Sequence, residues 1–353
     1  MITIKDVAER AGVGISTVSY VLNGNLKRVG PATRERVLEA MRDLNYRPNA
    51  VARSMVKRST KTIGLVIMEL DNPLFVPVTH GVEAILRDED YHILLVSVVD
   101  LEGEVQAIET LRSQQVDGFI FMSLSIRYPS DHILRLKEEG IPFVLINRYL
   151  EDSEVNLVRI DDFGAGLEAT RHLVSLGHTK LGIISGPIYN KWDRRSPIQR
   201  YAGWEQILKE HELPVRSEWV ILSDYTFEGG YQAIQQLLAQ TTGAVGRPTA
   251  LFVANESMAV GALQALHEHG LRVPQDIAIV SVGDPPFAAY TIPALSTFSL
   301  PMEEAGQTAA RILLDWIKSE KAPEPQQIVL SCTPRIRQSC GTKLNNLERK
   351  AWI

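Results

Sequence analysis

Three short segments within residues 3–45 repeat apolar positions at helical spacing. In the first segment, Thr3 is placed to cap a helix and Asp6 to reach back to it. A second helix is predicted near residues 15–23, after a glycine-rich turn, and a third begins at a Gly-Pro pair and runs to residue 44. We expect the apolar positions to meet in one small core: Ile4, Val7, Ala8, Ala11, Val18, Val21, Leu22, Val37, Leu38, Met41 and Leu44.

From residue 62 onward, apolar strands alternate with amphipathic segments of about ten to fifteen residues. This pattern predicts an α/β fold in which doubly wound parallel sheets are covered by helices on both faces. So many strands exceed one comfortable sheet, and we therefore expect two similar lobes with a ligand bound between them, at the carboxyl ends of the strands. The predicted strands are 62–70, 91–99, 118–124, 142–148, 157–161, 180–186, 219–224, 250–255, 277–283, 296–300 and 326–331.

Charge is distributed unevenly over the chain, whose formal net charge is −5. Residues 1–62 hold 12 Lys and Arg against 5 Asp and Glu, a balance of +7, so that the remaining 291 residues carry −12. A basic head on an acidic body favours a polyanionic partner for the head alone, although a solvated basic face has the same composition.

Several classes of protein are disfavoured by composition. No apolar run approaches the length of a membrane helix, and the first residues lack the apolar core of a secretory signal. The two cysteines, Cys332 and Cys340, provide neither a disulfide framework nor a four-ligand metal site. We therefore expect a reduced, cytoplasmic protein without a metal or another cofactor.

The first two helices and the tight turn between them form a predicted helix-turn-helix, whose second helix enters the DNA major groove. With Val18 on its inner face, the helix presents Ile15, Ser16, Ser19 and Tyr20 outward. Serine hydroxyls match several base edges, and an isoleucine packs well on a thymine methyl. Thr17 is better placed for a phosphate.

The stretch TIKDVAERAGVGISTVSYVLNG, followed by VGPATRERVLEAMRDLNYRPNAVARSM, resembles the headpiece and hinge of the LacI/GalR family of bacterial transcription regulators. Motifs of the body agree, among them DNPLF, HLVSLGHTKLGIISGP, RYAGW and YTIPALSTF, and the resemblance extends from about residue 3 to 341. It implies a helix-turn-helix headpiece, a hinge helix and a two-lobed sensor similar to periplasmic binding proteins. The DNA-contact residues that follow from the helix and the resemblance are Thr3, Ile15, Ser16, Thr17, Ser19, Tyr20, Asn23, Val29, Asn49, Ala52, Arg53 and Met55.

The resemblance also implies a domain plan. Residues 1–47 form the headpiece, 48–61 the hinge helix and linker, 62–341 the sensor and dimerisation domain, and 342–353 a tail. Within the sensor, the N-lobe is expected at 62–162 and 293–324, and the C-lobe at 163–292 and 325–341.

In the family, a leucine of the hinge helix wedges into the central minor groove of a palindromic operator, and this chain has Met55 at that place. Methionine is one of the apolar wedges found in minor grooves, so the role is compatible with the substitution. The alternative is a methionine buried against the core of the body.

Family pocket positions fall on ten residues of the body. Charged and amide groups there suit hydroxyls of a polar small molecule, and aromatic rings suit an apolar face. For each position, the alternative is an ordinary core or surface side chain. They are Leu70, Asp71, Phe75, Arg148, Asp161, Arg200, Tyr225, Asn255, Glu256 and Asp284.

Two departures from the family pattern concern the effector. Glu256 replaces a frequent aspartate, and Gly283 replaces the first member of an aspartate pair, which removes a hydroxyl acceptor. The loop 188–199 also places Lys191, Trp192, Arg194 and Arg195 near the predicted cleft. These features suggest an anionic or extended effector, such as a phosphorylated or oligomeric sugar, with a solvated basic loop as the alternative.

The segment GAGLEA at 164–169 formally fits a dinucleotide-binding fingerprint, but Asp161 and Asp162 precede it and would repel a pyrophosphate. No nucleophile elbow or other catalytic constellation is present. We therefore expect no enzyme but a homodimeric, effector-controlled repressor, bound to palindromic operator DNA in the nucleoid and to a small molecule that is sugar-like. The competing hypotheses are a solute-binding protein for a transporter, which has no use for residues 1–58, and a sugar-processing enzyme.

Overall fold

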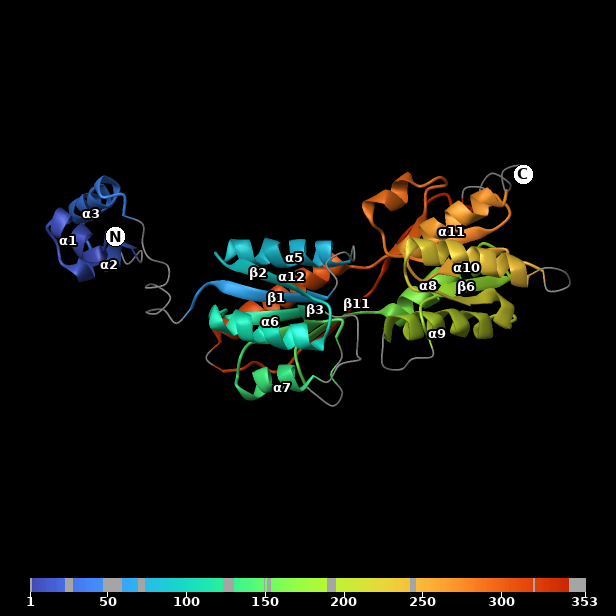
Figure 1. Cartoon of the computed structure of the whole chain (residues 1–353), viewed down its shortest axis with the longest axis horizontal. Helices are drawn as coiled ribbons and strands as arrows, with labels where there is room; N and C mark the ends of the chain where they lie inside the picture. Colours follow the sequence, from blue (N-terminus) through green and yellow to red (C-terminus); the bar gives the residue numbers. More distant parts are fainter. Residues whose placement is uncertain are drawn as a thin grey trace. The chain divides into compact units, whose positions relative to one another are not determined.

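The computed structural model describes residues 2–22, 28–46, 59–68, 74–122, 130–148, 150, 154–188, 195–241, 246–319 and 321–342. The chain divides into two compact units, residues 1–60 and 61–353 (Figure 1). The predicted hinge helix and the C-terminal tail beyond Thr342 lie outside the described residues.

The first unit contains the three predicted helices, α1 (Ile4–Ala11), α2 (Ile15–Leu22) and α3 (Pro31–Asp43). The capping box is confirmed, because the backbone N–H and the hydroxyl of Thr3 both donate to Asp6, at 2.7 and 2.8 Å. Gly12 ends α1 with φ +62°, a left-handed conformation that glycine adopts without strain. The sequence signals at the helix ends are therefore sufficient to define these three helices.

The small core of the first unit agrees with the predicted one at most positions. Val7, Val18 and Val37 are fully buried, but Leu38 is 38% exposed, so its assignment to the core is wrong. Ala40 fills the inward position instead, since it lies one turn after Val37 on the face that meets α1. Leucine at position 38 therefore lies on an open face of α3.

The second unit contains two six-stranded sheets that include all eleven predicted strands. The first has the order β11-β5-β4-β3-β1-β2 and is parallel throughout. Its strands are β1 (Thr62–Met68), β2 (His92–Val98), β3 (Gly118–Met122), β4 (Phe143–Ile146), β5 (Leu157–Ile160) and β11 (Gln327–Leu330). The central strands are buried along their whole length because helices cover both faces.

The second sheet has the order β12-β10-β9-β8-β6-β7, with all pairs parallel except β10 and β12. Its strands are β6 (Leu181–Ser185), β7 (Val220–Leu222), β8 (Ala250–Val253), β9 (Ala278–Val282), β10 (Ser296–Ser299) and β12 (Thr333–Arg335). The sequence analysis missed β12, because its three residues are exposed and show no alternation of apolar positions. Two doubly wound α/β lobes are thus confirmed.

Helices lie on both sides of each sheet (Figure 1). The first sheet is covered by α5 (Phe75–Asp88), α6 (Leu101–Ser113), α7 (Asp131–Glu138) and α12 (Met302–Lys318). The second is covered by α8 (Asp162–Ser175), α9 (Arg195–Glu210), α10 (Phe227–Gln240) and α11 (Glu256–Glu268). Short 3-10 helices occur at Ser217–Trp219 and Pro286–Tyr290.

The predicted lobe boundaries need correction at two of the three crossings. Strand β10 pairs with β9, so the chain returns to the N-lobe after Leu300 and not at residue 293. Strand β11 pairs with β5, so the last crossing follows Leu330 and not residue 324. The apolar pattern of a short strand reveals that it is a strand, but not which sheet edge it joins.

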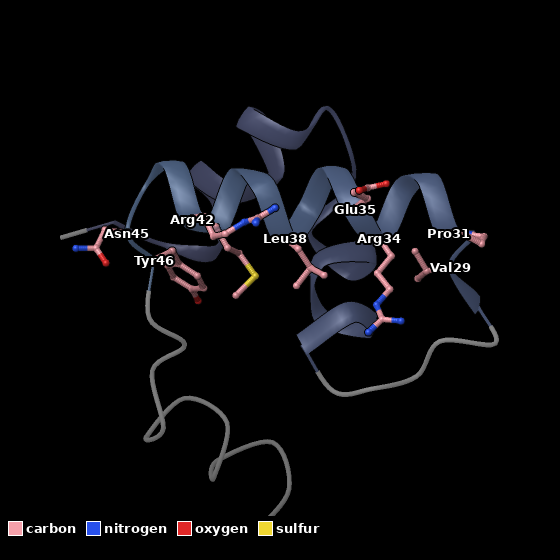
Figure 2. Close-up of a pocket in the computed structure, with 9 residues that line it drawn as sticks. Val29, Pro31, Arg34, Glu35, Leu38, Arg42, Asn45 and Tyr46 are labelled. Carbon is pink, nitrogen blue, oxygen red and sulfur yellow. The ribbon is translucent and has the colours of Figure 1, made fainter.

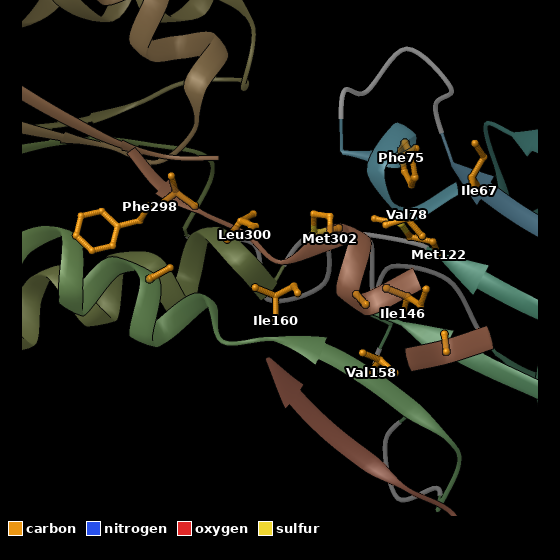
Figure 3. Packing of buried hydrophobic residues seen from close by; sticks show 14 of the residues in the cluster. Ile67, Phe75, Val78, Met122, Ile146, Val158, Ile160, Phe298, Leu300 and Met302 are labelled. Carbon is orange, nitrogen blue, oxygen red and sulfur yellow. The ribbon is translucent and has the colours of Figure 1, made fainter. Parts of the chain in front are cut away.

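One apolar cluster contains residues of both sheets and extends along the crossing segments. Figure 3 shows Phe298, Leu300 and Met302 in succession on one crossing segment, and Ile160 at the end of β5 on another. Burial of these side chains stabilises the observed course of the crossing segments. Exposing them to water would cost the free energy that their burial contributes.

Close contacts at glycines join three helix pairs. On α5 and α12, a Cβ at Gly81 would lie 2.0 Å from the carbonyl oxygen of Glu303, and a Cβ at Gly306 would lie 2.2 Å from that of Val78. The backbones of the two helices therefore touch, and any larger residue would separate them. The same reciprocal arrangement joins α8 to α9 and α10 to α11, at Gly166 with Gly203 and at Gly230 with Gly261.

Replacing Gly306 by alanine tests this contact. Because the new methyl group collides with backbone and not with a flexible side chain, we expect a loss of about 1–3 kcal/mol in the free energy of unfolding of the body. The matched control is Glu304→Ala, which removes an exposed side chain from the same helix. Chemical denaturation followed by circular dichroism measures both, and equal stability of the two variants would contradict the proposed contact.

Candidate DNA and effector sites

Helix α2 presents a polar and partly apolar face beside its buried residues. Ile15 is 44% exposed and Ser16 is exposed at the start of the helix, whereas Val18 and Val21 are buried. Thr17, Ser19 and Tyr20 are partly exposed. The outward residues predicted from the sequence thus lie on the accessible side of α2, and buried valines fix the rotation of the helix.

Tyr20 is positioned by a neighbouring cation. Arg28 donates a hydrogen bond of 3.2 Å to the Tyr20 hydroxyl, and its guanidinium lies 5.4 Å from the centre of the tyrosine ring. This contact restricts the ring and adds a positive charge beside α2, which suits a nucleic-acid backbone.

Other predicted DNA contacts differ in their setting. The side chain of Thr3 is engaged in the cap of α1. Val29 is 9% exposed and belongs to the core of the first unit, so its predicted contact is corrected to a packing role for the side chain. Asn23, Asn49, Ala52, Arg53 and Met55 lie outside the described residues.

A groove follows the outer face of α3, where Figure 2 shows its lining side chains along one side of the helix. Leu38, Met41 and Tyr46 form its apolar part, and Arg34, Glu35 and Arg42 add charges of both signs. This groove belongs to the first unit, whereas all the predicted effector residues belong to the second unit.

Polar side chains converge at the carboxyl edge of the second sheet, which is the edge where parallel sheets bind ligands. Arg200, from α9, is 5% exposed and donates to Oδ1 of Asp162 through Nε at 2.9 Å, while its Nη2 lies 2.8 Å from the same oxygen. It also donates to the carbonyl oxygen of Ala254 at 2.5 Å, directly after β8. Ser196 donates to the other oxygen of Asp162 at 2.7 Å.

The charge on Arg200 is fixed by its surroundings. Although burial lowers the pKa of its guanidinium, Asp162 and to a lesser extent Tyr225 and Glu256 raise it above the ordinary value. Arg200 is therefore a permanent, buried cation whose charge is compensated by a neighbouring carboxylate.

Tyr225 follows β7 and Asn255 follows β8, and both lie at the carboxyl edge of the second sheet. Asn255 caps α11 by accepting a hydrogen bond of 3.0 Å from the Met258 N–H, and its amide donates to the carbonyl oxygen of Tyr225 at 3.1 Å. The Tyr225 ring covers Gly186, because a Cβ there would lie 2.2 Å from the ring. The amide contact holds Tyr225 in a left-handed conformation, with φ +70°.

Glu256 follows Asn255 as the first residue of α11 and is 4% exposed. Burial raises the pKa of its carboxyl group, and the charge of Arg200 offsets this only in part. The structure thus brings four predicted effector residues to one edge: Arg200, Tyr225, Asn255 and Glu256.

Arg148 and Asp161, two further predicted effector residues, each have a partner of their own. Arg148 is 3% exposed and forms an ion pair of 2.5 Å with Glu104, which His132 also contacts; these contacts lower the pKa of Glu104 even though burial alone would raise it. Asp161 accepts the Gly164 N–H at 2.9 Å as the cap of α8.

Phe75 and Asp284 need separate treatment. Phe75 is 1% exposed in the core, so the predicted stacking of its ring on an effector is corrected to packing (Figure 3). Asp284 accepts hydrogen bonds from Arg337 at 2.7 and 3.1 Å and from Thr297 at 2.7 Å. Leu70 and Asp71 lie outside the described residues, as do Lys191, Trp192, Arg194 and the side chain of Arg195.

Sequence reasoning missed Asp162 and Ser196 as parts of the site. Asp162 was visible only as the second of two aspartates before a helix, and nothing in the sequence links it to Arg200, 38 residues later. Among the residues that the structure describes, no group of metal-ligating side chains is found and no helix could cross a membrane.

The chain belongs to the LacI family of bacterial regulatory proteins. Residues 3–49 match the model of that family, and residues 170–340 match a periplasmic binding protein-like domain. The ribose operon repressor of Haemophilus influenzae is 36% identical over 341 residues, which cover 96% of this chain and 98% of the relative. The catabolite control protein A of Priestia megaterium is 32% identical over 90% of this chain and 93% of the relative.

Solved structures agree with the family. The lac repressor dimer bound to operator and the anti-inducer ONPF has a TM-score of 0.81 and 27% identity, covering 96% of this chain and 99% of that one. A complex of the transcriptional regulator CelR with cellobiose has a TM-score of 0.71 and 31% identity, covering 96% and 100%. The class expected from the sequence is thus confirmed: a DNA-binding repressor and not an enzyme.

Replacing Arg200 by methionine tests the buried ion pair. Because Asp162 then keeps its charge without a cationic partner, we expect a loss of about 3–5 kcal/mol in the free energy of unfolding. The exposed Lys209→Met on the same helix is the control, and Arg200→Met combined with Asp162→Asn should recover part of the loss. Denaturant titration measures all three, and a single variant no less stable than the control would overturn the assignment.

Proposed function

We propose that this chain is a homodimeric repressor that reads a palindromic operator with α2 and responds to a neutral carbohydrate bound at the carboxyl edges of its two sheets. The observation that carries the DNA-binding role is the accessible face of α2, with Ile15 and Ser16 at its start, in a segment of charge +7. Operator DNA is then the polyanionic partner of this basic segment. A repressor of bacterial genes would act in the cytoplasm.

Exposed apolar side chains support the dimer. Leu94 and Leu95 lie on the edge strand β2 of the first sheet, and Tyr290 and Ile292 on the C-lobe are 84% and 95% exposed. Large apolar side chains exposed on an edge strand or on a loop are typical of surfaces that another chain covers. A two-fold interface would also match the symmetry of a palindrome.

A carbohydrate effector is supported by the relatives and by the charges at the site. A ribose operon repressor is 36% identical, and one structural neighbour contains cellobiose. Arg200 is already paired with Asp162, so it adds no uncompensated positive charge for an anion. Because this cation is compensated, we favour a neutral sugar.

The two competing functions have less support. A solute-binding protein has no use for the helix-turn-helix, and an enzyme would need acid and base groups free to act on a sugar.

Effector control then follows from differential affinity, because a sugar that binds one arrangement of the lobes more tightly shifts the population that binds the operator.

Substitutions on α2 test the DNA interface. With a duplex selected by the wild-type protein from a random library, we expect Ile15→Ala and Ser16→Ala each to reduce the ratio of specific to random-duplex affinity by about tenfold. Glu39→Gln, an exposed position on α3, should leave the ratio unchanged. Gel-shift titrations over a range of salt concentrations provide the ratios, and salt-insensitive or absent DNA binding by the wild type would refute the proposal.

The dimer is tested by adding charge to its expected interface. In a two-fold dimer, each substitution is present in both subunits and adds two charges to the interface. We therefore expect Leu95→Asp and Ile292→Asp to weaken dimerisation by about tenfold or more. Val215→Asp is the control, because Val215 is an apolar residue that is 47% exposed and is not one of the four proposed interface residues. Sedimentation velocity measures the dissociation constants, and a monomeric wild type or unchanged variants would contradict this interface.

A further inference from the structure

The carboxyl group of Glu256 fills the space that a side chain at position 283 would need. Gly283 directly follows β9, and β8, which leads to Glu256, is its parallel neighbour. A Cβ at position 283 would lie 2.1 Å from Oε2 of Glu256 and 2.9 Å from its Cδ. A side chain at position 283 would therefore require the Glu256 carboxyl group to move away from its observed place.

The backbone at Gly283 has a hydrogen bond and a conformation that both define its position. Its N–H donates to the Phe298 carbonyl oxygen at 2.9 Å, and its φ of +93° lies in the left-handed region that favours glycine. Glycine thus meets two demands at once, the conformation of the turn and the space for the carboxyl group.

This contact joins the two sequence departures at the effector site. The longer side chain at position 256 and the missing side chain at position 283 compensate for each other, because a glutamate reaches one methylene further than an aspartate. A carboxyl group from α11 thus lies beside position 283, which has no side chain of its own.

The surroundings of Glu256 determine which ligand it suits. The Arg200 guanidinium is held by Asp162 and by the Ala254 carbonyl oxygen. Burial raises the pKa of Glu256. A carboxyl group accepts hydrogen bonds, and its protonated form also donates them. A hydroxyl group has the same two capacities, whereas a phosphate or carboxylate at this place would approach a buried acid.

We propose that Glu256 is a specificity-determining residue of the effector site, where its carboxyl group replaces a side chain at position 283 and selects neutral, hydroxyl-bearing ligands over anionic ones. This inference rests on the proposed sugar-responsive function. The proposed role depends more on the length of the Glu256 side chain than on its negative charge.

The test compares reach with charge in the full-length protein. Thermal-shift and calorimetric titrations use D-ribose, D-glucose, cellobiose and ribose 5-phosphate as probes. For the sugar that binds the wild type best, we expect Glu256→Asp to lose at least about tenfold in affinity, because its carboxyl group withdraws from position 283. Glu256→Gln keeps the reach and both hydrogen-bonding capacities, and it should lose less than Glu256→Asp.

Two further variants keep the result interpretable. Glu228→Gln changes an exposed acid in the first turn of α10 and should bind sugar as the wild type does. Gly283→Ala should displace the carboxyl group from the opposite side and weaken sugar binding, which tests the contact even if Glu256→Asp does not fold. Operator affinity without sugar, measured for each variant, separates a local effect from unfolding.

The outcomes distinguish this inference from the proposed function. Wild-type-like sugar affinity in Glu256→Asp and Gly283→Ala would overturn the inference alone, as would tighter binding of ribose 5-phosphate than of ribose. If none of the four probes stabilises the wild type, the sugar-responsive function is contradicted and the inference falls with it.

Discussion

The ion pair between Arg200 and Asp162 is the interaction on which the effector side of the C-lobe depends. It joins α9 to the start of α8, and the third contact of Arg200 reaches the backbone after β8. A buried guanidinium is costly unless its donors are satisfied, so the positions of these three elements are coupled. Glu256 and Tyr225 lie close enough to the same cation to interact with its charge.

Close helix packing makes this ion pair possible. Gly166 lies one turn after Asp162 on α8, and a Cβ there would lie 2.1 Å from the carbonyl oxygen of Arg200. The backbone of α9 therefore touches α8 at the residue whose side chain reaches Asp162. The glycines of the GAGLEA segment have a structural explanation, because Gly164 donates to the capping Asp161 and Gly166 allows the two helices to touch.

Local signals in the sequence predicted elements well and long-range partners poorly. Caps and apolar spacing located α1 to α3 and eleven strands, because those signals act within a few residues. Which of the two sheets β10 and β11 join depends on pairing with strands that are distant in the sequence. The spacing of apolar residues does not encode such pairing. Likewise, Arg148 and Phe75 follow or precede strands as site residues do, yet an ion pair with Glu104 and burial in the core engage them.

The same limit explains why a departure from a family pattern is a weak guide to lost chemistry. Gly283 by itself indicates a missing acceptor, and Glu256 by itself indicates a conservative change. Only the packing of β8 beside β9 shows that one carboxyl group fills the space next to the other residue. A polar group that is lost after one strand can be replaced by a residue that follows the neighbouring strand, because the carboxyl ends of parallel neighbours lie on the same surface.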